Sequence, residues 1–183
     1  MSRNNGKLPR LWFFIDDRLN VTDILAVCLA LPRGSGVVVR ASSAIRLRLL
    51  LAQLRPLSRR LVLSVSGPSD GQGLGRHLGS RGLAQRRRGL VTASAHSIPE
   101  LRRAERAGAT LVFVSPVFAT RSHPGARAMG PIRLAGLVRA TRLPVVALGG
   151  MTEARWRRVR PTGAYGWAAI GGLLDQKLMA VPR

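Results

Sequence analysis

Short apolar runs alternate with amphipathic stretches along most of the chain. Strands buried on both faces read as nearly continuous runs of β-branched and other apolar residues, whereas helices show a wider spacing. Most of the runs are followed by a stretch with helical spacing, which is the order expected of an α/β (β/α)₈ TIM barrel. We expect strands at residues 11–15, 37–40, 61–65, 74–78, 90–94, 111–114, 144–148 and 165–170.

Helix start signals support this order. Ser97 is followed three residues later by Glu100, which is the capping-box spacing, and this predicts a helix that ends at Gly108. A further helix is expected over 132–140, and another from Thr152 to Gly163. In the first part of the chain, Asn20 or Thr22 is the expected N-cap of the first helix. Ser42 or Ser43 is the expected N-cap of a second helix, which runs to about Leu54.

The alternation is weakest around residues 65–90, where we expect shortened or irregular units. Residues 66–73 form a turn-rich run with no room for a full helix. The chain of 183 residues predicts one barrel domain over 1–183, with a loose N-terminal tail at 1–9.

A net charge of +22 raises the question of nucleic-acid binding. The arginines are scattered through every predicted helix, and the dense cluster Arg86–Arg88 has no aromatic residues interleaved for stacking on bases. We therefore expect no specific nucleic-acid partner, although nonspecific attraction to polyanions follows from such a charge.

The apolar runs are too short to cross a bilayer, and we expect a cytoplasmic protein without a membrane partner. Cys28 is the single cysteine, so neither an intramolecular disulfide nor a cysteine metal cluster can form. Its place in the apolar pattern of a helix predicts a buried side chain.

Two glycine pairs follow the last two predicted strands. Gly149-Gly150 and Gly171-Gly172 each precede a helix, at the positions where TIM barrels often bind phosphate. Bare backbone N–H groups at such turns suit an anion. The pattern predicts a small phosphorylated molecule as substrate, and a homo-oligomer remains open.

His96 comes just after the predicted fifth strand, beside Ser94. An imidazole titrates near neutral pH and so suits acid–base catalysis. His77 and His123 follow other strands, and the histidine spacing matches no metal motif. We therefore expect no metal ligands among them.

The runs SAHSIPELRRAERAGATLVFVSPVF and PVVALGGMT resemble the thiamine-phosphate synthase and TenI family, and the similarity extends over about residues 8–175. The resemblance implies a (β/α)₈ barrel and a role in thiamine biosynthesis. Synthases of the family join a hydroxymethylpyrimidine pyrophosphate to a thiazole phosphate carboxylate with magnesium, and the TenI branch includes thiazole tautomerases.

The resemblance also assigns residues. It implies that Arg40 contacts pyrophosphate, that Thr120 matches the family's threonine in the sixth loop, and that His123 stands in place of a phosphate-binding lysine. Ser94 and Thr120 are both expected to bind substrate. Gly149 and Gly150 match the phosphate-binding glycines, and Gly171 replaces a serine.

The implied magnesium carboxylates are missing from the sequence. Ser64 and Val65 occupy the positions of an asparagine–aspartate pair, and Gly82 occupies that of the second metal-binding aspartate. Departure of pyrophosphate needs a metal ion or an equal positive charge from protein groups. Proton transfer within a thiazole needs only a phosphate-binding site and one acid–base group.

These observations favour a metal-independent thiazole tautomerase, in which the resemblance makes His96 the acid–base residue. The alternatives are a working synthase that recruits magnesium through Asp16, Asp17 or Asp70, and an inactive paralogue that binds a ligand or regulates. No cofactor is expected unless the chain is an active synthase, which would use magnesium.

Overall fold

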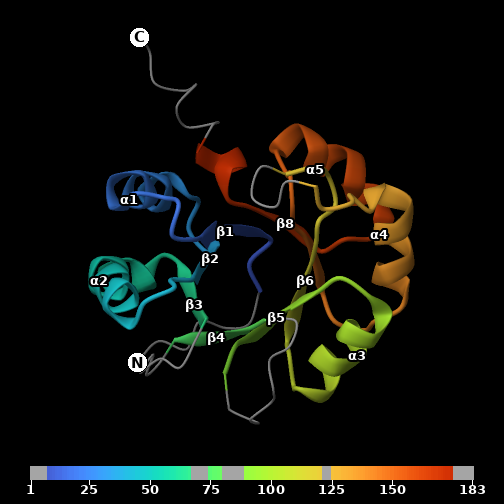
Figure 1. Ribbon diagram of the computed structural model, residues 1–183, viewed down its shortest axis with the longest axis horizontal. Helices are drawn as coiled ribbons and strands as arrows, with labels where there is room; N and C mark the ends of the chain where they lie inside the picture. The colour runs from blue at the N-terminus through green and yellow to red at the C-terminus, as the bar shows by residue number, and fades with distance from the viewer. Residues whose placement is uncertain (1–7, 67–73, 80–88, 121–124, 175–183) are drawn as a thin grey trace.

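The computed structural model describes residues 8–66, 74–79, 89–120 and 125–174. Within these ranges the strands are all parallel, pair in sequence order and close between β1 and β8, which confirms the predicted barrel (Figure 1). The strands are β1 (Leu11–Ile15), β2 (Gly36–Val39), β3 (Val62–Ser66), β4 (Gly75–Leu78), β5 (Val91–Ala95), β6 (Leu111–Val114), β7 (Val145–Ala147) and β8 (Gly166–Ala169).

Two helices cover the first strands. The side chain of Asn20 accepts the N–H of Asp23 and begins α1 (Val21–Ala30), so Asn20 and not Thr22 is the cap. Ser43 caps α2 (Ala44–Leu54), which ends where predicted and passes into a 3₁₀ turn at Arg55–Arg59. In each case the cap satisfies a backbone N–H that has no partner within the helix.

Three helices cover the last strands: α3 (Ile98–Arg106), α4 (Gly130–Arg139) and α5 (Glu153–Val159). Ser97 and Thr152 cap α3 and α5 as predicted. The α3 helix ends at Arg106, two residues before Gly108, which takes the positive φ that stops a helix. After α5, a 3₁₀ turn over Arg160–Thr162 carries the chain to Gly163, the predicted end of that helical stretch.

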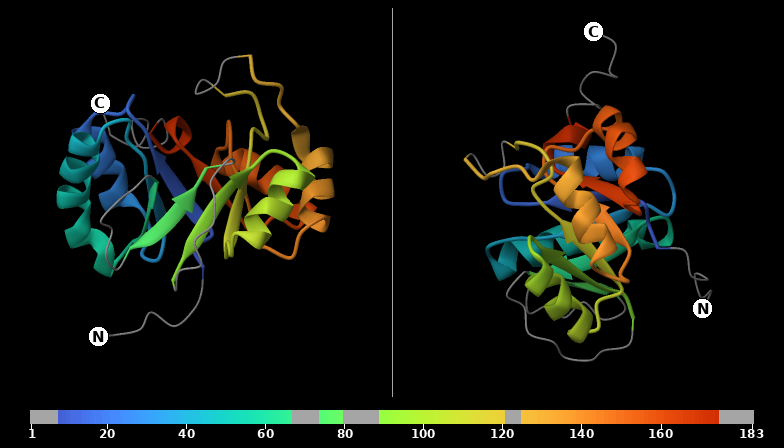
Figure 2. Two further views of the ribbon diagram at one scale, coloured as in Figure 1. Left: turned by 60° about the horizontal axis from the view of Figure 1, so that its bottom comes forward. Right: turned by 90° about the vertical axis from the view of Figure 1, so that its right-hand side faces the viewer.

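Between β3 and β5, the residues that the structure describes form one short strand, β4. β4 pairs with both β3 and β5, which confirms the strand expected at 74–78. In the described ranges no α-helix separates β3 from β4 or β4 from β5. Figures 1 and 2 accordingly show α1 and α2 beside β1–β3 and the other three labelled helices beside β5–β8.

Aromatic rings fill the interior of the barrel. Phe113 on β6 makes edge-to-face contacts with Trp12 and Phe14 on β1, with ring centroids 5.2 and 4.6 Å apart. Gly36 leaves room for the indole, because a Cβ there would lie 2.2 Å from ring atoms of Trp12. Rings from opposite sides of the barrel therefore meet at its centre.

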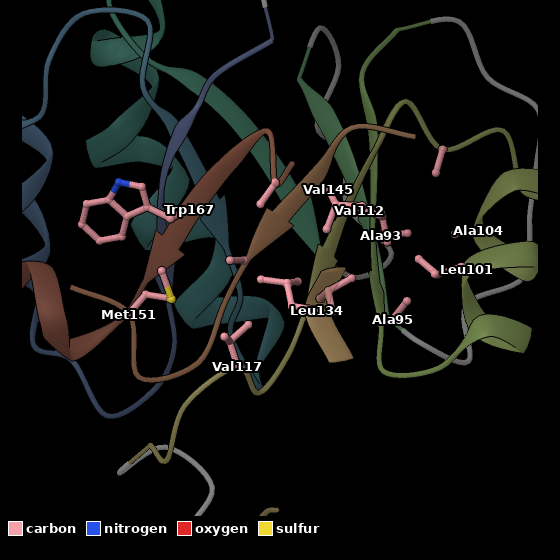
Figure 3. Packing of buried hydrophobic residues seen from close by; sticks show 14 of the residues in the cluster. Ala93, Ala95, Leu101, Ala104, Val112, Val117, Leu134, Val145, Met151 and Trp167 are labelled. Atoms are coloured by element: carbon pink, nitrogen blue, oxygen red, sulfur yellow. The ribbon is translucent and has the colours of Figure 1, made fainter. Parts of the chain in front are cut away.

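Two separate apolar layers lie between the strands and the helices. One joins β1–β3 to α1 and α2, and the other joins β5–β8 to α3, α4 and α5. Figure 3 shows the second layer, where Leu101 and Leu134 of the helices face the strands near Ala93 and Val112. Burial of these faces is the main force holding the helices in place.

Both Leu8 and Pro9, within the expected loose tail, are attached to the barrel. The carbonyl of Leu8 accepts the hydroxyl of Tyr165, and that of Pro9 accepts the indole N–H of Trp12. Cys28 is buried as predicted, and burial raises the pKa of its thiol to about 12. Among the described residues no helix is long and apolar enough to span a membrane.

Candidate functional site

A pocket of about 870 Å³ opens at the carboxyl ends of the strands. This volume lies within the range of small-molecule sites. Ends of β-strands and the loops after them build its wall, as expected of a TIM barrel. Its wall includes every expected site residue that the structure describes: Arg40, Ser94, His96, Thr120, Gly149, Gly150, Gly171 and Gly172. His123 lies outside the described residues.

The turn after β7 requires both of its glycines. Gly149 and Gly150 have φ of +93° and +61°. A Cβ on Gly149 would lie 2.7 Å from the Cα of Pro116, and one on Gly150 would lie 2.3 Å from the carbonyl oxygen of Ala119. The turn is thus pressed against the loop that follows β6, and bare backbone forms this part of the pocket wall.

The second glycine pair is also crowded. Gly171 and Gly172 begin a helical turn over 171–174 after β8. A Cβ on Gly172 would lie 2.2 Å from the carbonyl oxygen of Met151, which follows the first pair. The two glycine turns are therefore neighbours in the pocket, although 20 residues of sequence separate them.

His96 is exposed on the pocket wall and its ring is oriented by the backbone. The ring Nδ1 lies 2.6 Å from the carbonyl oxygen of Ser115. The backbone N–H of His96 donates to the carboxylate of Glu100 at 2.6 Å. A carbonyl only accepts, so Nδ1 is the donor in this hydrogen bond, and Nε2 is the ring nitrogen left for proton transfer. This is the arrangement required of a general base.

A network of polar side chains extends from the pocket wall, at His77 and Ser94, into the barrel interior, at Thr92 and Ser64. His77 Nδ1 lies 2.9 Å from the hydroxyl of Thr92, which is 3.1 Å from that of Ser64. His77 Nε2 lies 3.2 Å from the hydroxyl of Ser94. Burial, and then the charge of Arg40, lower the pKa of His77 to about 3, so this imidazole is neutral and acts as a hydrogen-bonding hub.

The described residues do not fit a magnesium site. Ser64 bonds to Thr92 in the interior, and Val65 is buried in the apolar layer against α2, so neither side chain presents a carboxylate. Oxygen ligands, carboxylates above all, are what magnesium requires. In the described ranges no group of three histidine, cysteine, aspartate or glutamate side chains converges.

Asp16 and Asp17 do not fill this gap. Partial burial opposes ionisation of Asp16, but hydrogen bonds and charge from Arg18 outweigh it and lower the pKa of that carboxyl. Asp17 pairs with Arg46 at 3.0 Å and accepts the N–H of Ser42. Neither carboxylate lines the pocket, and Asp70 lies outside the described residues.

Arg155 is a pocket residue that the sequence reasoning missed. Its guanidinium donates to the carbonyl of Gly150 and lies 5.0 Å from the ring centroid of Phe118. The signal was present in the sequence, because Arg155 comes three residues after the predicted cap Thr152. That spacing puts it on the first turn of the helix that follows the glycine pair.

The sequence pattern of a protein family described as thiamine monophosphate synthase matches residues 69–173. The chain belongs to this family. The family resemblance inferred from the motifs is therefore confirmed.

Relatives in the thiamine-phosphate synthase family align with about half of the chain. A putative thiamine-phosphate synthase 2 from Aquifex aeolicus is 38% identical over 86 residues, which are 47% of this chain and 46% of the relative. A thiamine-phosphate synthase from Chloroflexus aurantiacus is 36% identical over 121 residues, 63% of this chain and 55% of the relative. The chain spans about half the length of the curated relatives it matches.

Solved structures of the family share the fold over most of the chain. The thiamine phosphate pyrophosphorylase of Pyrococcus furiosus superimposes with a TM-score of 0.71 and 22% identity, covering 93% of this chain and 92% of that one. The enzyme of the same name from Bacteroides thetaiotaomicron gives 0.64 and 20% identity, covering 91% and 85%. This chain thus shares the barrel fold of these two structures.

Proposed function

We propose that this chain binds a thiazole phosphate in the barrel pocket and acts on it in thiamine biosynthesis. The observation that carries the proposal is the turn Gly149-Gly150, which brings bare backbone to the pocket wall and excludes any side chain. Arg40 supplies a positive charge from β2, on another side of the same pocket. Backbone N–H groups and a guanidinium are the groups that hold phosphates in proteins.

The first candidate reaction is formation of thiamine phosphate, which is what the relatives' names describe. Pyrophosphate leaves in such a reaction, and its developing charge needs positive groups nearby. Arg40 and Arg155 both line the pocket and supply that charge from this chain's own residues. Support for this reaction comes from the family more than from the local chemistry.

The second candidate reaction is proton transfer within a thiazole phosphate carboxylate. His96 favours it, because Ser115 holds Nδ1 and leaves Nε2 to accept and return a proton. The backbone turns would hold the phosphate while the imidazole acts on the ring. This tautomerase needs no divalent cation.

One pair of assays separates the reactions. The purified protein is incubated with thiazole phosphate carboxylate and hydroxymethylpyrimidine pyrophosphate, and thiamine phosphate is measured by chromatography. The unstable thiazole tautomer is then supplied alone, and its conversion is followed with wild type and His96→Ala. Condensation product assigns the synthase, and a conversion rate that falls at least about a hundredfold in the variant assigns the tautomerase. The proposal would be overturned if neither product formed and if the protein bound the thiazole phosphate and its unphosphorylated alcohol with equal affinity.

A further inference from the structure

The residues of this pocket do not match the metal-dependent chemistry that the family resemblance implies. A metal-dependent site needs carboxylates, but Ser64 and Val65 occupy the positions of the asparagine–aspartate pair that the resemblance implies, and they face the interior network and an apolar layer. Gly82, at the position of the second implied aspartate, lies outside the described residues. The pocket instead contains two arginines, Arg40 and Arg155. Two guanidinium groups therefore supply positive charge to the pocket wall.

Arg155 is built into the pocket more firmly than a surface arginine. Its guanidinium donates to Gly150, lies over the ring of Phe118, and is only partly exposed. Contact with an aromatic face favours a fixed position for the planar group. Arg157, on the same helix, is exposed and pairs only with Glu153 among the contacts that the structure describes, so it is a matched comparison.

The contact with Gly150 leaves further donors. A guanidinium carries five N–H groups in a planar fork that matches the oxygens of a phosphate. One edge of Arg155 holds the glycine turn, and the remaining N–H groups are on the side chain that lines the pocket. The same residue can thus fix the turn and contact an anion.

We propose that Arg155 is a phosphate-binding residue that also fixes the Gly149-Gly150 turn, and that it allows the pocket to bind phosphate and pyrophosphate without a divalent cation. The inference deepens the proposed function and rests on it for the identity of the substrate. The anion-binding part stands on the geometry of Arg155 and is tested with inorganic ions.

Calorimetric titration with inorganic pyrophosphate, in the presence of a chelator, is the test. Wild type binds, and Arg155→Gln, which keeps a donor but loses the charge, binds about tenfold to a hundredfold more weakly, as expected for loss of a charge-assisted hydrogen bond. Arg155→Lys loses less, because the charge remains. Phe118→Leu loses about threefold, because the guanidinium keeps its carbonyl contact but not its aromatic support.

Arg157→Gln is the control for the overall positive charge of the protein. Its affinity stays within about twofold of wild type, since an exposed charge is screened by salt. Equal weakening of Arg155→Gln and Arg157→Gln would show that the affinity reflects net charge, and unchanged affinity in Arg155→Gln would also overturn the inference. Circular dichroism of each variant, compared with wild type, guards against loss of fold.

Failure of the inference is distinguishable from failure of the proposed function. Pyrophosphate binding that requires added magnesium overturns the inference, whatever the enzyme assays give. If pyrophosphate binding resists the chelator and depends on Arg155, the inference stands. If the protein then shows no preference for thiazole phosphate over its alcohol, the proposed substrate is refuted.

Discussion

The strands β5–β8 and the strands β1–β4 form one barrel but contribute unequally to its pocket. Among the described residues, the first half gives the pocket wall Phe14, Arg40, Ser66, His77 and Gly79, and all others come from the second half. The second half also has a described helix after each of β5, β6 and β7. A closed barrel can therefore draw most of its pocket wall from one half of its strands.

Because the two halves share the aromatic interior of the barrel, we expect them to unfold together. Phe113 on β6 packs against Trp12 and Phe14 on β1, so Phe113→Ala should destabilise both halves, by about 4 kcal/mol. Urea unfolding followed by circular dichroism and by tryptophan fluorescence should give one coincident, shifted transition. Ile132→Ala, at a side chain that is 88% exposed, should change stability by less than about 0.5 kcal/mol. Separate transitions for the two probes would mean that the halves unfold independently.

The glycine turn should couple stability to binding. Gly150→Ala places a Cβ in contact with the carbonyl of Ala119 at a positive φ, and should cost about 3 kcal/mol and remove phosphate binding. Gly34→Ala is the matched change in the first half, since φ is +81° there but nothing lies within 4 Å of the added atom. It should cost about 1–2 kcal/mol and leave binding intact. Denaturation and calorimetric titration check both, and phosphate affinity retained in Gly150→Ala would contradict the account.

His77 makes the interior sensitive to acid. Its pKa is about 3 in the folded protein and ordinarily 6.5, so the unfolded chain binds the extra proton first and stability falls as pH decreases below 6.5. Between pH 7 and pH 5 the wild type should lose about 2 kcal/mol from this group. His77→Gln removes the titration while keeping groups that can hydrogen-bond. Denaturation at the two pH values in both proteins checks this, and equal losses would show that the folded imidazole titrates normally.

The helix caps should show the smallest effect and no difference between halves. Ser43 caps α2 and Ser97 caps α3, each accepting the N–H of the residue three positions later. Ser43→Ala and Ser97→Ala should each cost about 1 kcal/mol in urea denaturation. A much larger loss in one of them would show that the two helix layers differ in stability, and not only in their contribution to the pocket.

The sequence predicted the fold well because its signals are local. Runs of apolar residues and capping side chains mark strands and helix starts within a few positions, and Ser97 and Thr152 lie where the pattern placed them. Helix ends were less certain, since Ala107 still fits the helix geometry and the chain turns only at Gly108. The attachment of Pro9 was missed because it depends on Trp12, through a contact that no periodicity reveals.

The candidate site was predicted in part, for a related reason. Positions after strands identify residues such as His96 and the glycine pairs, because parallel strands bring their carboxyl ends to one edge. Side chains that act across elements were harder to find. The hydrogen bonds of His77 to Thr92 and Ser94 join neighbouring strands, and Arg155 reaches back from a helix to the turn before it.

The most direct test of the unequal halves is a nuclear magnetic resonance titration of the labelled protein with thiazole phosphate. We expect saturable shifts of the Nε–H of Arg155 and of the backbone amides of Gly149, Gly150, Gly171 and Gly172. Amides at the ends of β3 and β4 should move little. Shifts centred on β3 and β4, or shifts spread over exposed arginines without saturation, would contradict the claim that the second half of the barrel holds the ligand.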